Sequence, residues 1–289
     1  MRLVTFTFQG SHEQRVGVVL GDRVLDAGLA GGQSMLDLID NARLPEPSRL
    51  EGAGETEGVP LADVALCAPI PRPRANVICL GRNYYEHAVE SAQARNEDVG
   101  KPTLFTKAVT SVIGPYDDIP LDPHLSTELD WEVELAAVIG RRARHVPAER
   151  ALDHVFGYTV LNDVSARDLQ HNFGGQFFYG KSLDGSCPIG PWIVTADEIP
   201  DPQDLTLRLR VNGEIKQESN TRDMIFDVRT VIETLSRAMT LEPGQLIATG
   251  TPPGVGFARK PPEFLRPGDL MESQIEGIGL MRNRVRGVS

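Results

Sequence analysis

Short runs in which apolar and polar positions alternate dominate the chain. Between residues 126 and 140, large apolar side chains alternate with Glu132 and Glu134, which is the period of a β-strand. Other strand-like runs lie at 2–7, 76–80, 103–106, 158–161, 192–194 and 205–211. Gly21-Asp22 and Asn212-Gly213 each stand between two such runs and are typical of hairpin turns.

Helical periodicity is rarer than strand periodicity. The pattern predicts one helix after Arg82, a short one at 148–154 and one at 226–239, which ends before Pro243-Gly244. Strands and helices do not alternate strictly, so a Rossmann sheet or a TIM barrel is disfavoured. The sequence therefore predicts a strand-dominated α+β fold.

A change in composition divides the chain. The first part is β-rich, and it is followed at 41–73 by a stretch rich in Pro, Gly, Glu and Ala that is typical of an irregular connection. We expect a small N-terminal β-rich domain with its linker at 1–72 and a catalytic domain at 73–289.

Composition narrows the class of protein. A chain of 289 residues can bury a sizeable core, and its net charge of −11 disfavours binding to nucleic acid or to an anionic membrane surface. Cys67, Cys79 and Cys187 lie far apart without CxxC spacing, so neither a disulfide framework nor a structural zinc site is expected. No signal peptide or membrane-spanning run is visible, and we expect a cytoplasmic protein.

Three carboxylates are candidate metal ligands. Glu132 and Glu134 share one strand face, where two buried like charges would need a cation or a raised pKa. Asp163 ends another apolar run, and three oxygen ligands without His or Cys favour a hard cation, Mg²⁺ or Mn²⁺. Taken alone, the two glutamates suit a solvated strand face better than a metal site, and Asp163 suits an ordinary turn.

Three further motifs carry candidate chemistry. In "GRNYYEHAVE", His87 and Glu90 are three residues apart on one helix face, where a carboxylate can orient an imidazole that takes a proton from water. Lys181 lies in a glycine-rich apolar run and could bind a substrate carboxylate or an oxyanion, or simply pair with a neighbouring acid. The loop "ATGTPPGVG" offers backbone N–H groups and the hydroxyl of Thr251, but it is not a P-loop.

The order of these motifs resembles the fumarylacetoacetate hydrolase family. "GRNYYEHAVE", "LDWEVELAAVIG", "GYTVLNDVSARD", "GKSLDGSCPIGPW", "ATGTPPGVG" and "PGDLMESQIEGIG" occur in that order between residues 76 and 285. The resemblance implies a mixed β-sheet roll, a Mg²⁺ or Mn²⁺ ion and a homodimer. It implies the following site residues: metal ligands Glu132, Glu134 and Asp163; catalytic His87, Glu90 and Lys181; and Arg82, Lys107, Gln176 and Thr251 against a small anionic 2-oxo acid.

The family chemistry sets the expected function. We expect hydrolysis of a carbon–carbon bond in a 2,4-dioxo acid of the acylpyruvate or fumarylpyruvate type, from aromatic or sugar-acid breakdown, giving pyruvate and a carboxylic acid. His87 with Glu90 would activate the water, and Lys181 would stabilise developing negative charge. The alternative uses an enolate without added water: decarboxylation of oxaloacetate or an oxo-tricarboxylate, or isomerisation of a 2-hydroxymuconate-type diacid. Phe173, Phe177 and Phe178 could line the end of the pocket that selects the substrate, or be core residues.

Overall fold

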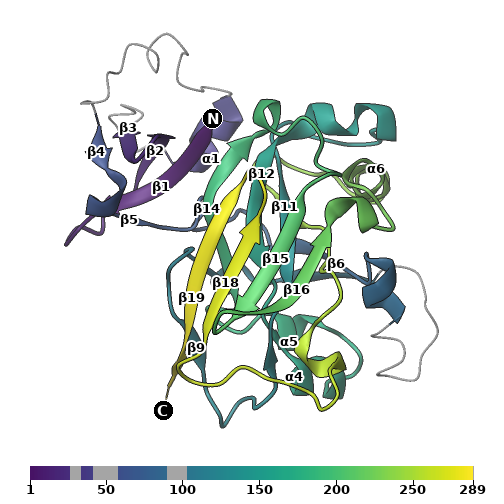
Figure 1. Ribbon diagram of the computed structural model, residues 1–289. Coiled ribbons are helices and arrows are strands. Elements are labelled where there is room, and N and C mark those ends of the chain that lie inside the picture. Colours follow the sequence, from purple (N-terminus) through teal and green to yellow (C-terminus); the bar gives the residue numbers. More distant parts are fainter. Residues whose placement is uncertain (27–33, 42–57, 90–102, 289) are drawn as a thin grey trace.

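The computed structural model describes residues 1–26, 34–41, 58–89 and 103–288 (Figure 1). Strands are the main secondary structure and form two main sheets, with short helices at their ends. The expected strand-dominated mixed-sheet fold is confirmed.

The N-terminal strands continue the large sheet of the main body. They are β1 (Arg2–Phe8), β2 (Arg15–Leu20), β3 (Arg23–Asp26), β4 (Val59–Pro60) and β5 (Val64–Leu66), with η1 at Leu61–Asp63 and α1 at Met35–Asn41. The β2–β3 hairpin turns where Gly21-Asp22 predicts it, with Leu20 opposite Arg23. Strand β1 pairs antiparallel with β14 (Cys187–Thr195), placing Leu3 opposite Ile193. The division at residue 72 stays a prediction, since this sheet runs across it.

The large sheet runs in the order β4-β3-β2-β1-β14-β12-β11-β17-β6-β7. Its remaining strands are β6 (Val77–Gly81), β7 (Thr103–Lys107), β11 (Val133–Ile139), β12 (Val155–Asn162) and β17 (Leu246–Ala248), with β8 (Val112–Ile113) beside β14. The pair β17–β6 is parallel, whereas β11 is antiparallel to both neighbours, so the sheet is mixed. All seven residues of β11 are buried, which explains its nearly continuous apolar sequence.

A second sheet packs across the middle of the first. It has the order β16-β15-β18-β19-β9, formed by β9 (Ile119–Leu121), β15 (Thr206–Val211), β16 (Glu214–Asn220), β18 (Leu270–Ile275) and β19 (Gly279–Gly287). Figure 1 shows β15, β18 and β19 in front of β11, β12 and β14. Leu135, Val160, Leu207 and Met271 belong to one hydrophobic core between these layers. The β15–β16 hairpin closes at Asn212-Gly213 as predicted, with Val211 opposite Glu214.

The helices are short and lie at the ends of the sheets. They are α4 (Arg167–Asn172), α5 (Phe178–Lys181) and α6 (Val228–Ala238), with 3₁₀ turns at η2 (Val109–Ser111), η3 (Ala148–His154), η4 (Ala196–Glu198), η5 (Thr221–Asp223) and η6 (Gly256–Ala258). Helix α6 was predicted, and Asp227 caps it by accepting a hydrogen bond from Thr230 N at 2.7 Å. Helices α4 and α5 were not, because six and four residues are too few to show a helical period.

The strand predicted across residues 131–139 is interrupted. Leu129 and Asp130 form β10, which pairs with β13 (Ser165–Ala166) in a separate two-stranded sheet. Trp131 and Glu132 then connect β10 to β11. This break carries the chain from one sheet to another at the position of the candidate metal ligands.

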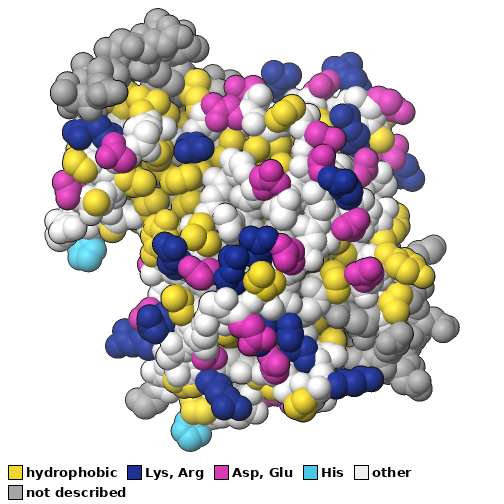
Figure 2. All heavy atoms as spheres, in the orientation of Figure 1, with side chains coloured by type: hydrophobic (Ala, Val, Ile, Leu, Met, Phe, Trp, Pro, Cys, Tyr) yellow, Lys and Arg dark blue, Asp and Glu magenta, His cyan; other side chains and the backbone are white. Residues whose placement is uncertain are grey.

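Charged side chains are mixed over the surface that Figure 2 presents. Lysine and arginine side chains alternate there with aspartate and glutamate, and apolar side chains gather mainly over the N-terminal strands. None of the helices in the described part of the chain is both long enough and apolar enough to span a membrane.

Candidate active site and metal centre

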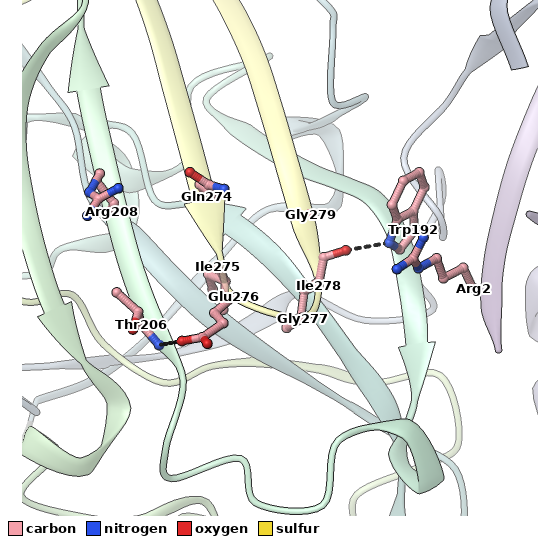
Figure 3. Close-up of a pocket in the computed structure, with 10 residues that line it drawn as sticks. All are labelled: Arg2, Trp192, Thr206, Arg208, Gln274, Ile275, Glu276, Gly277, Ile278 and Gly279. Atoms are coloured by element: carbon pink, nitrogen blue, oxygen red, sulfur yellow. Dashed lines mark hydrogen bonds between the residues drawn. The ribbon is translucent and has the colours of Figure 1, made fainter. Parts of the chain in front are cut away.

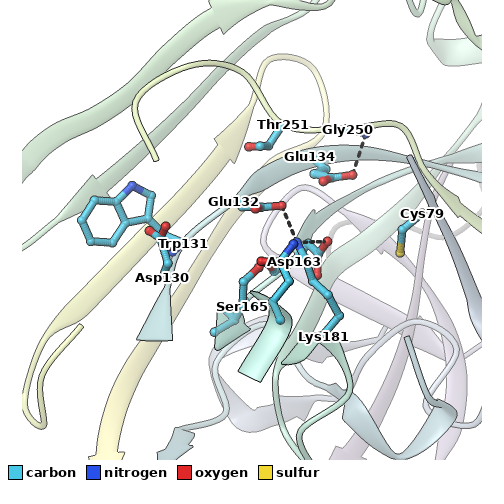
Figure 4. Close-up of polar contacts among 12 residues, drawn as sticks. Cys79, Asp130, Trp131, Glu132, Glu134, Asp163, Ser165, Lys181, Gly250 and Thr251 are labelled. Atoms are coloured by element: carbon cyan, nitrogen blue, oxygen red, sulfur yellow. Dashed lines mark hydrogen bonds and ion pairs between the residues drawn. The ribbon is translucent and has the colours of Figure 1, made fainter. Parts of the chain in front are cut away.

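The three predicted carboxylate ligands meet in one buried cluster (Figure 4). One oxygen from each of Glu132, Glu134 and Asp163 lies within 4.8 Å of the others, and the three residues are 5%, 1% and 0% exposed. Glu132 directly precedes β11, Glu134 is the second residue of that strand, and Asp163 directly follows β12. Asp163 N donates to Glu132 O at 2.8 Å, so the backbone itself holds the two segments together.

The side chains of Lys181, Arg167 and Lys107 contact the carboxylates of this cluster directly. Lys181 Nζ donates to Glu132 Oε2 at 2.8 Å and to Asp163 Oδ2 at 2.7 Å. Arg167 Nη2 lies 2.6 Å from Glu132 Oε1. Glu134 instead accepts a hydrogen bond from Gly250 N at 2.7 Å. Positive charge is therefore concentrated around Glu132 and Asp163, and Glu134 is stabilised by a backbone dipole.

This uneven distribution of charge shifts the pKa values of the two glutamates in opposite directions. Burial alone would raise the pKa of Glu132, but Lys181 and Arg167 outweigh it and lower that pKa to about 2. Burial, with the charges of Asp163 and Glu132, raises the pKa of Glu134 well above its ordinary value. Burial and the neighbouring negative charges therefore disfavour the ionised form of Glu134, and a bound cation would favour it.

The donor set fits a divalent metal ion. Three carboxylates supply only hard oxygen donors, which suit Mg²⁺ and Mn²⁺ equally well. Among the described ion pairs, Lys107, Lys181 and Arg167 contact Glu132 or Asp163, and none of them includes Glu134. A cation held by Glu132, Glu134 and Asp163 would place a positive charge beside Glu134.

A small enclosed cavity of about 30 Å³ adjoins the cluster. It is lined by five predicted site residues, Arg82, His87, Glu132, Lys181 and Thr251, and by Phe177, one of the three phenylalanines considered for the pocket. The other lining residues are Leu80, Gly81, Phe105, Arg167, Gln170, His171 and Phe257. The cavity combines convergent polar groups with an apolar side, as small-molecule sites do.

The remaining predicted residues lie elsewhere. Lys107 is fully buried beneath Asp163, where its Nζ donates to Asp163 Oδ1 at 2.8 Å and to Val164 O at 3.0 Å, so it supports the cluster from behind rather than lining the cavity. Gln176 is exposed between α4 and α5 and does not line the cavity. Glu90 lies outside the described residues, so its predicted contact with His87 stays a prediction.

His87 reaches the cavity through a short helical segment at 85–89. Its residue is 6% exposed. Asn83, which the sequence suggests as a helix cap, is used differently: its Nδ2 donates to Thr249 O at 2.7 Å and to Phe226 O at 2.9 Å. Those bonds fasten the start of the segment to the loop that carries Thr251 and Gly250.

Asp130 is a structural hub that the motifs did not reveal. It is fully buried, and its carboxylate accepts hydrogen bonds from Gly256 N at 2.7 Å, Phe257 N at 3.0 Å and Arg167 Nε at 2.9 Å. Arg167 in turn donates to Gln170 Oε1 at 3.0 Å. Asp130 therefore fixes the arginine that pairs with a candidate metal ligand. An acid two residues before Glu132 was the only signal in the sequence.

A larger cleft of about 530 Å³ lies apart from the cluster (Figure 3). Arg2 lies over the Trp192 ring at 5.4 Å from its centre, and Trp192 Nε1 donates to Ile278 O at 2.5 Å. On the other side, Thr206 N donates to Glu276 Oε2 at 3.1 Å. These groups join β1 and β14 to the β18–β19 hairpin. These side chains bind one another across the cleft, which is typical of residues with a structural role.

Comparison with known proteins identifies the family. Residues 76–286 match the fumarylacetoacetate (FAA) hydrolase C-terminal family. The chain belongs to the fumarylacetoacetate hydrolase family. This confirms the resemblance drawn from the ordered motifs.

Named relatives cover nearly the whole chain. The mitochondrial oxaloacetate tautomerase Fahd2a of Rattus norvegicus is 42% identical over 99% of this chain and 91% of its own length. The oxaloacetate tautomerase YisK of Bacillus subtilis is 47% identical over 78% of this chain and 74% of its own. At these identities the chain is an enzyme of the family. The names of these relatives refer to oxaloacetate and not to hydrolysis of a carbon–carbon bond.

Solved structures show the same fold. Fumarylacetoacetate hydrolase from Exiguobacterium antarcticum superposes with a TM-score of 0.86 at 43% identity, each chain covered completely. Maleylpyruvate hydrolase from Sphingobium sp. SYK-6, in complex with manganese(II) and pyruvate, gives a TM-score of 0.78 at 33% identity, also over the full length of both chains. A manganese ion in that neighbour agrees with the buried acidic cluster described here.

Proposed function

We propose that this protein is a divalent-metal-dependent oxaloacetate tautomerase, which interconverts the enol and keto forms of oxaloacetate. The observation that carries the proposal is the cavity at Glu132, Lys181, Arg167 and His87, taken together with relatives of 42% and 47% identity that bear this name. The earlier alternative, oxaloacetate decarboxylation or diacid isomerisation, lies closer to this proposal than the expected hydrolysis does.

The reaction needs one proton moved and no bond between heavy atoms broken. The enol loses its hydroxyl proton at the C2 oxygen, and C3 gains a proton; the reverse reaction exchanges these roles. An imidazole accepts and returns protons near neutral pH, so His87 at the cavity edge is our candidate for the group that serves C3. When bound, a divalent cation would polarise the 2-oxo group and stabilise negative charge on its oxygen.

The chain's own cations hold the substrate. Oxaloacetate carries two carboxylates, and Lys181, Arg167 and Arg82 bring positive charge to the same small cavity. Gln170 adds an amide that can donate to an oxygen of the substrate. When both carboxylates of oxaloacetate are held, C3 has one orientation, which favours proton transfer on a single face.

Hydrolysis is the weaker proposal, because the relatives of 42% and 47% identity are named oxaloacetate tautomerases. A neighbour named maleylpyruvate hydrolase keeps hydrolysis among the outcomes to be tested. Mg²⁺ or Mn²⁺ as the metal, a homodimeric assembly and a cytoplasmic location remain predictions.

The decisive experiment follows the enol directly. Enol oxaloacetate is added to protein with Mg²⁺, with Mn²⁺ or after chelation; its ultraviolet absorbance reports loss of the enol, and malate dehydrogenase with NADH traps the keto form. We expect metal-dependent acceleration of enol loss without release of CO₂. Release of CO₂ would identify a decarboxylase, and acetate plus pyruvate from acetylpyruvate, with oxaloacetate unchanged, would identify a hydrolase.

A matched pair of histidine variants tests the proposed role of His87. His87→Asn removes the imidazole from the cavity, whereas His154→Asn removes a half-buried imidazole at the end of η3 that does not line the cavity. The first change should slow the enol–keto exchange by about 10²–10⁴-fold, and the second should leave it unchanged. Equal rates for both variants would exclude His87 as the proton carrier.

A further inference from the structure

Four rings form a continuous line along one side of the cavity. Phe105 of β7 contacts Phe177 with ring centres 5.5 Å apart, and Phe177 contacts His171 of α4 at 6.3 Å. His171 then contacts Phe257 of η6 at 5.9 Å. All four residues line the cavity, and we call them the aromatic wall.

Each end of the aromatic wall is fixed to a cation of the acidic cluster. Lys181 Nζ lies 5.0 Å from the centre of the Phe105 ring, and the guanidinium carbon of Arg167 lies 4.4 Å from that of Phe257. Both cations also contact Glu132. The wall and the charged floor of the cavity are therefore held at a set separation by buried ion pairs and cation–π contacts.

Phe177 stands in the middle of the line. It immediately precedes α5 and touches rings on both sides, whereas Phe173 and Phe178 of the same segment are 54% and 45% exposed. Only Phe177 of these three residues lines the cavity. The structure thus selects one of the three phenylalanines that the sequence left undecided.

We propose that the aromatic wall, with Phe177 at its centre, restricts the site to a four-carbon 2-oxo diacid. The inference rests on the proposed function and names what limits its substrate. A 2-oxo acid held by Lys181 and Arg167 extends from the charged floor, and each added carbon must displace a ring already packed against its neighbours. A well-packed pocket distinguishes acids that differ by one methylene by about 10–200-fold.

Binding of a homologous series tests this without requiring turnover. Calorimetry on Mn²⁺-loaded protein compares oxaloacetate, 2-oxoglutarate and 2-oxoadipate, which have four, five and six carbons. For the natural sequence we expect the Kd to rise about tenfold or more with each added carbon. In Phe177→Ala the ratio of the six-carbon to the four-carbon Kd should fall by about tenfold.

Two further variants keep the test specific. Phe178→Ala removes an identical but exposed side chain from the same segment, and it should leave the ratio unchanged. Phe177→Leu keeps an apolar side chain and should give an intermediate ratio if Phe177→Ala fails to fold, as monitored by circular dichroism and Mn²⁺ affinity.

The possible failures are distinguishable. Three results would refute the proposed role of the aromatic wall. They are equal affinity of the natural protein for all three acids, no binding of any of them, and an unchanged ratio in both Phe177 variants. If four-carbon selectivity is observed and the ratio responds to Phe177, but the enol assay shows no acceleration, the wall stands and the tautomerase proposal fails. If the enol assay shows acceleration but binding shows no chain-length preference, the tautomerase proposal stands and the proposed role of the aromatic wall fails.

Discussion

Replacing Asp130 by asparagine should destabilise the fold through its hydrogen bonds. The fully buried carboxylate accepts from Trp131 N at 2.8 Å and Gly256 N at 2.7 Å through one oxygen, and from Phe257 N at 3.0 Å and Arg167 Nε at 2.9 Å through the other. Asparagine has nearly the same shape, but its NH₂ group must face one of these donor pairs. Either orientation of the amide therefore removes two hydrogen bonds.

The structure sets the size of the effect. Two hydrogen bonds to a charged acceptor, at about 1.5–3 kcal/mol each, give a loss of about 3–6 kcal/mol. Removing one partner of a buried ion pair costs about 3–5 kcal/mol. Arg167 keeps its contacts with Glu132 and Gln170, so its charge is not stranded and the lower part of the range applies. We expect a loss of about 3–4 kcal/mol.

Urea unfolding of metal-free protein at neutral pH measures this loss. Asp153→Asn is the matched control, because Asp153 is exposed and pairs only with Arg150 among its described ion pairs; its midpoint should stay within experimental error. A loss below about 1 kcal/mol for Asp130→Asn would refute the reasoning, since it would mean that Asp130 is not the anchor of Arg167.

Three other predictions concern the metal centre and its surroundings. Mn²⁺ at 100 times its Kd should raise the free energy of unfolding by about 2.7 kcal/mol, and chelation should reverse this in thermal unfolding; no shift would contradict the metal site. Because the folded state raises the pKa of Glu134, it keeps a proton that the unfolded chain loses near the ordinary value of 4.5. The metal-free protein should therefore lose stability relative to Glu134→Gln as pH rises above that value, measured as the difference between their urea midpoints; parallel pH profiles would refute the shift. Lys181→Met leaves Glu132 and Asp163 without their shared cation, and should lower metal-free stability by about 3–5 kcal/mol in the same assay, whereas Lys260→Met at an exposed site should not.

Local signals predicted the parts of the fold that depend on neighbouring residues. The hairpin at Asn212-Gly213 forms because both residues adopt positive φ, 51° and 83°, which these two types tolerate. Helix α6 begins at an Asp cap and buries Val231 and Leu235 at helical spacing. In both cases the physical cause lies within a few residues, where sequence pattern can show it.

Elements held by tertiary contacts were missed. Helices α4 and α5 are stabilised by packing against β13 and β7, not by their own period. Arg167 of α4 lines the cavity, yet its place in the motif gave it no predicted role. For Lys107 the resemblance implies a contact with the substrate, whereas the structure shows that it faces Asp163 from behind.

The sequence by itself predicted that Glu132 and Glu134 point the same way, because side chains two residues apart in an extended chain do so. Their carboxylates do meet in one cluster, although β11 begins only at Val133. The ordered motifs likewise identified the family, and with it Asp163 and Lys181 as members of one site. Only the tertiary structure decided which charges balance which acids: Lys181 reaches Glu132 across 49 residues, and Arg167 reaches Asp130 across 37. Such contacts depend on how sheets and short helices pack, and residue spacing along the chain carries no record of that packing. The pKa of each carboxylate, the size of the cavity and the ring that closes it follow from that packing alone.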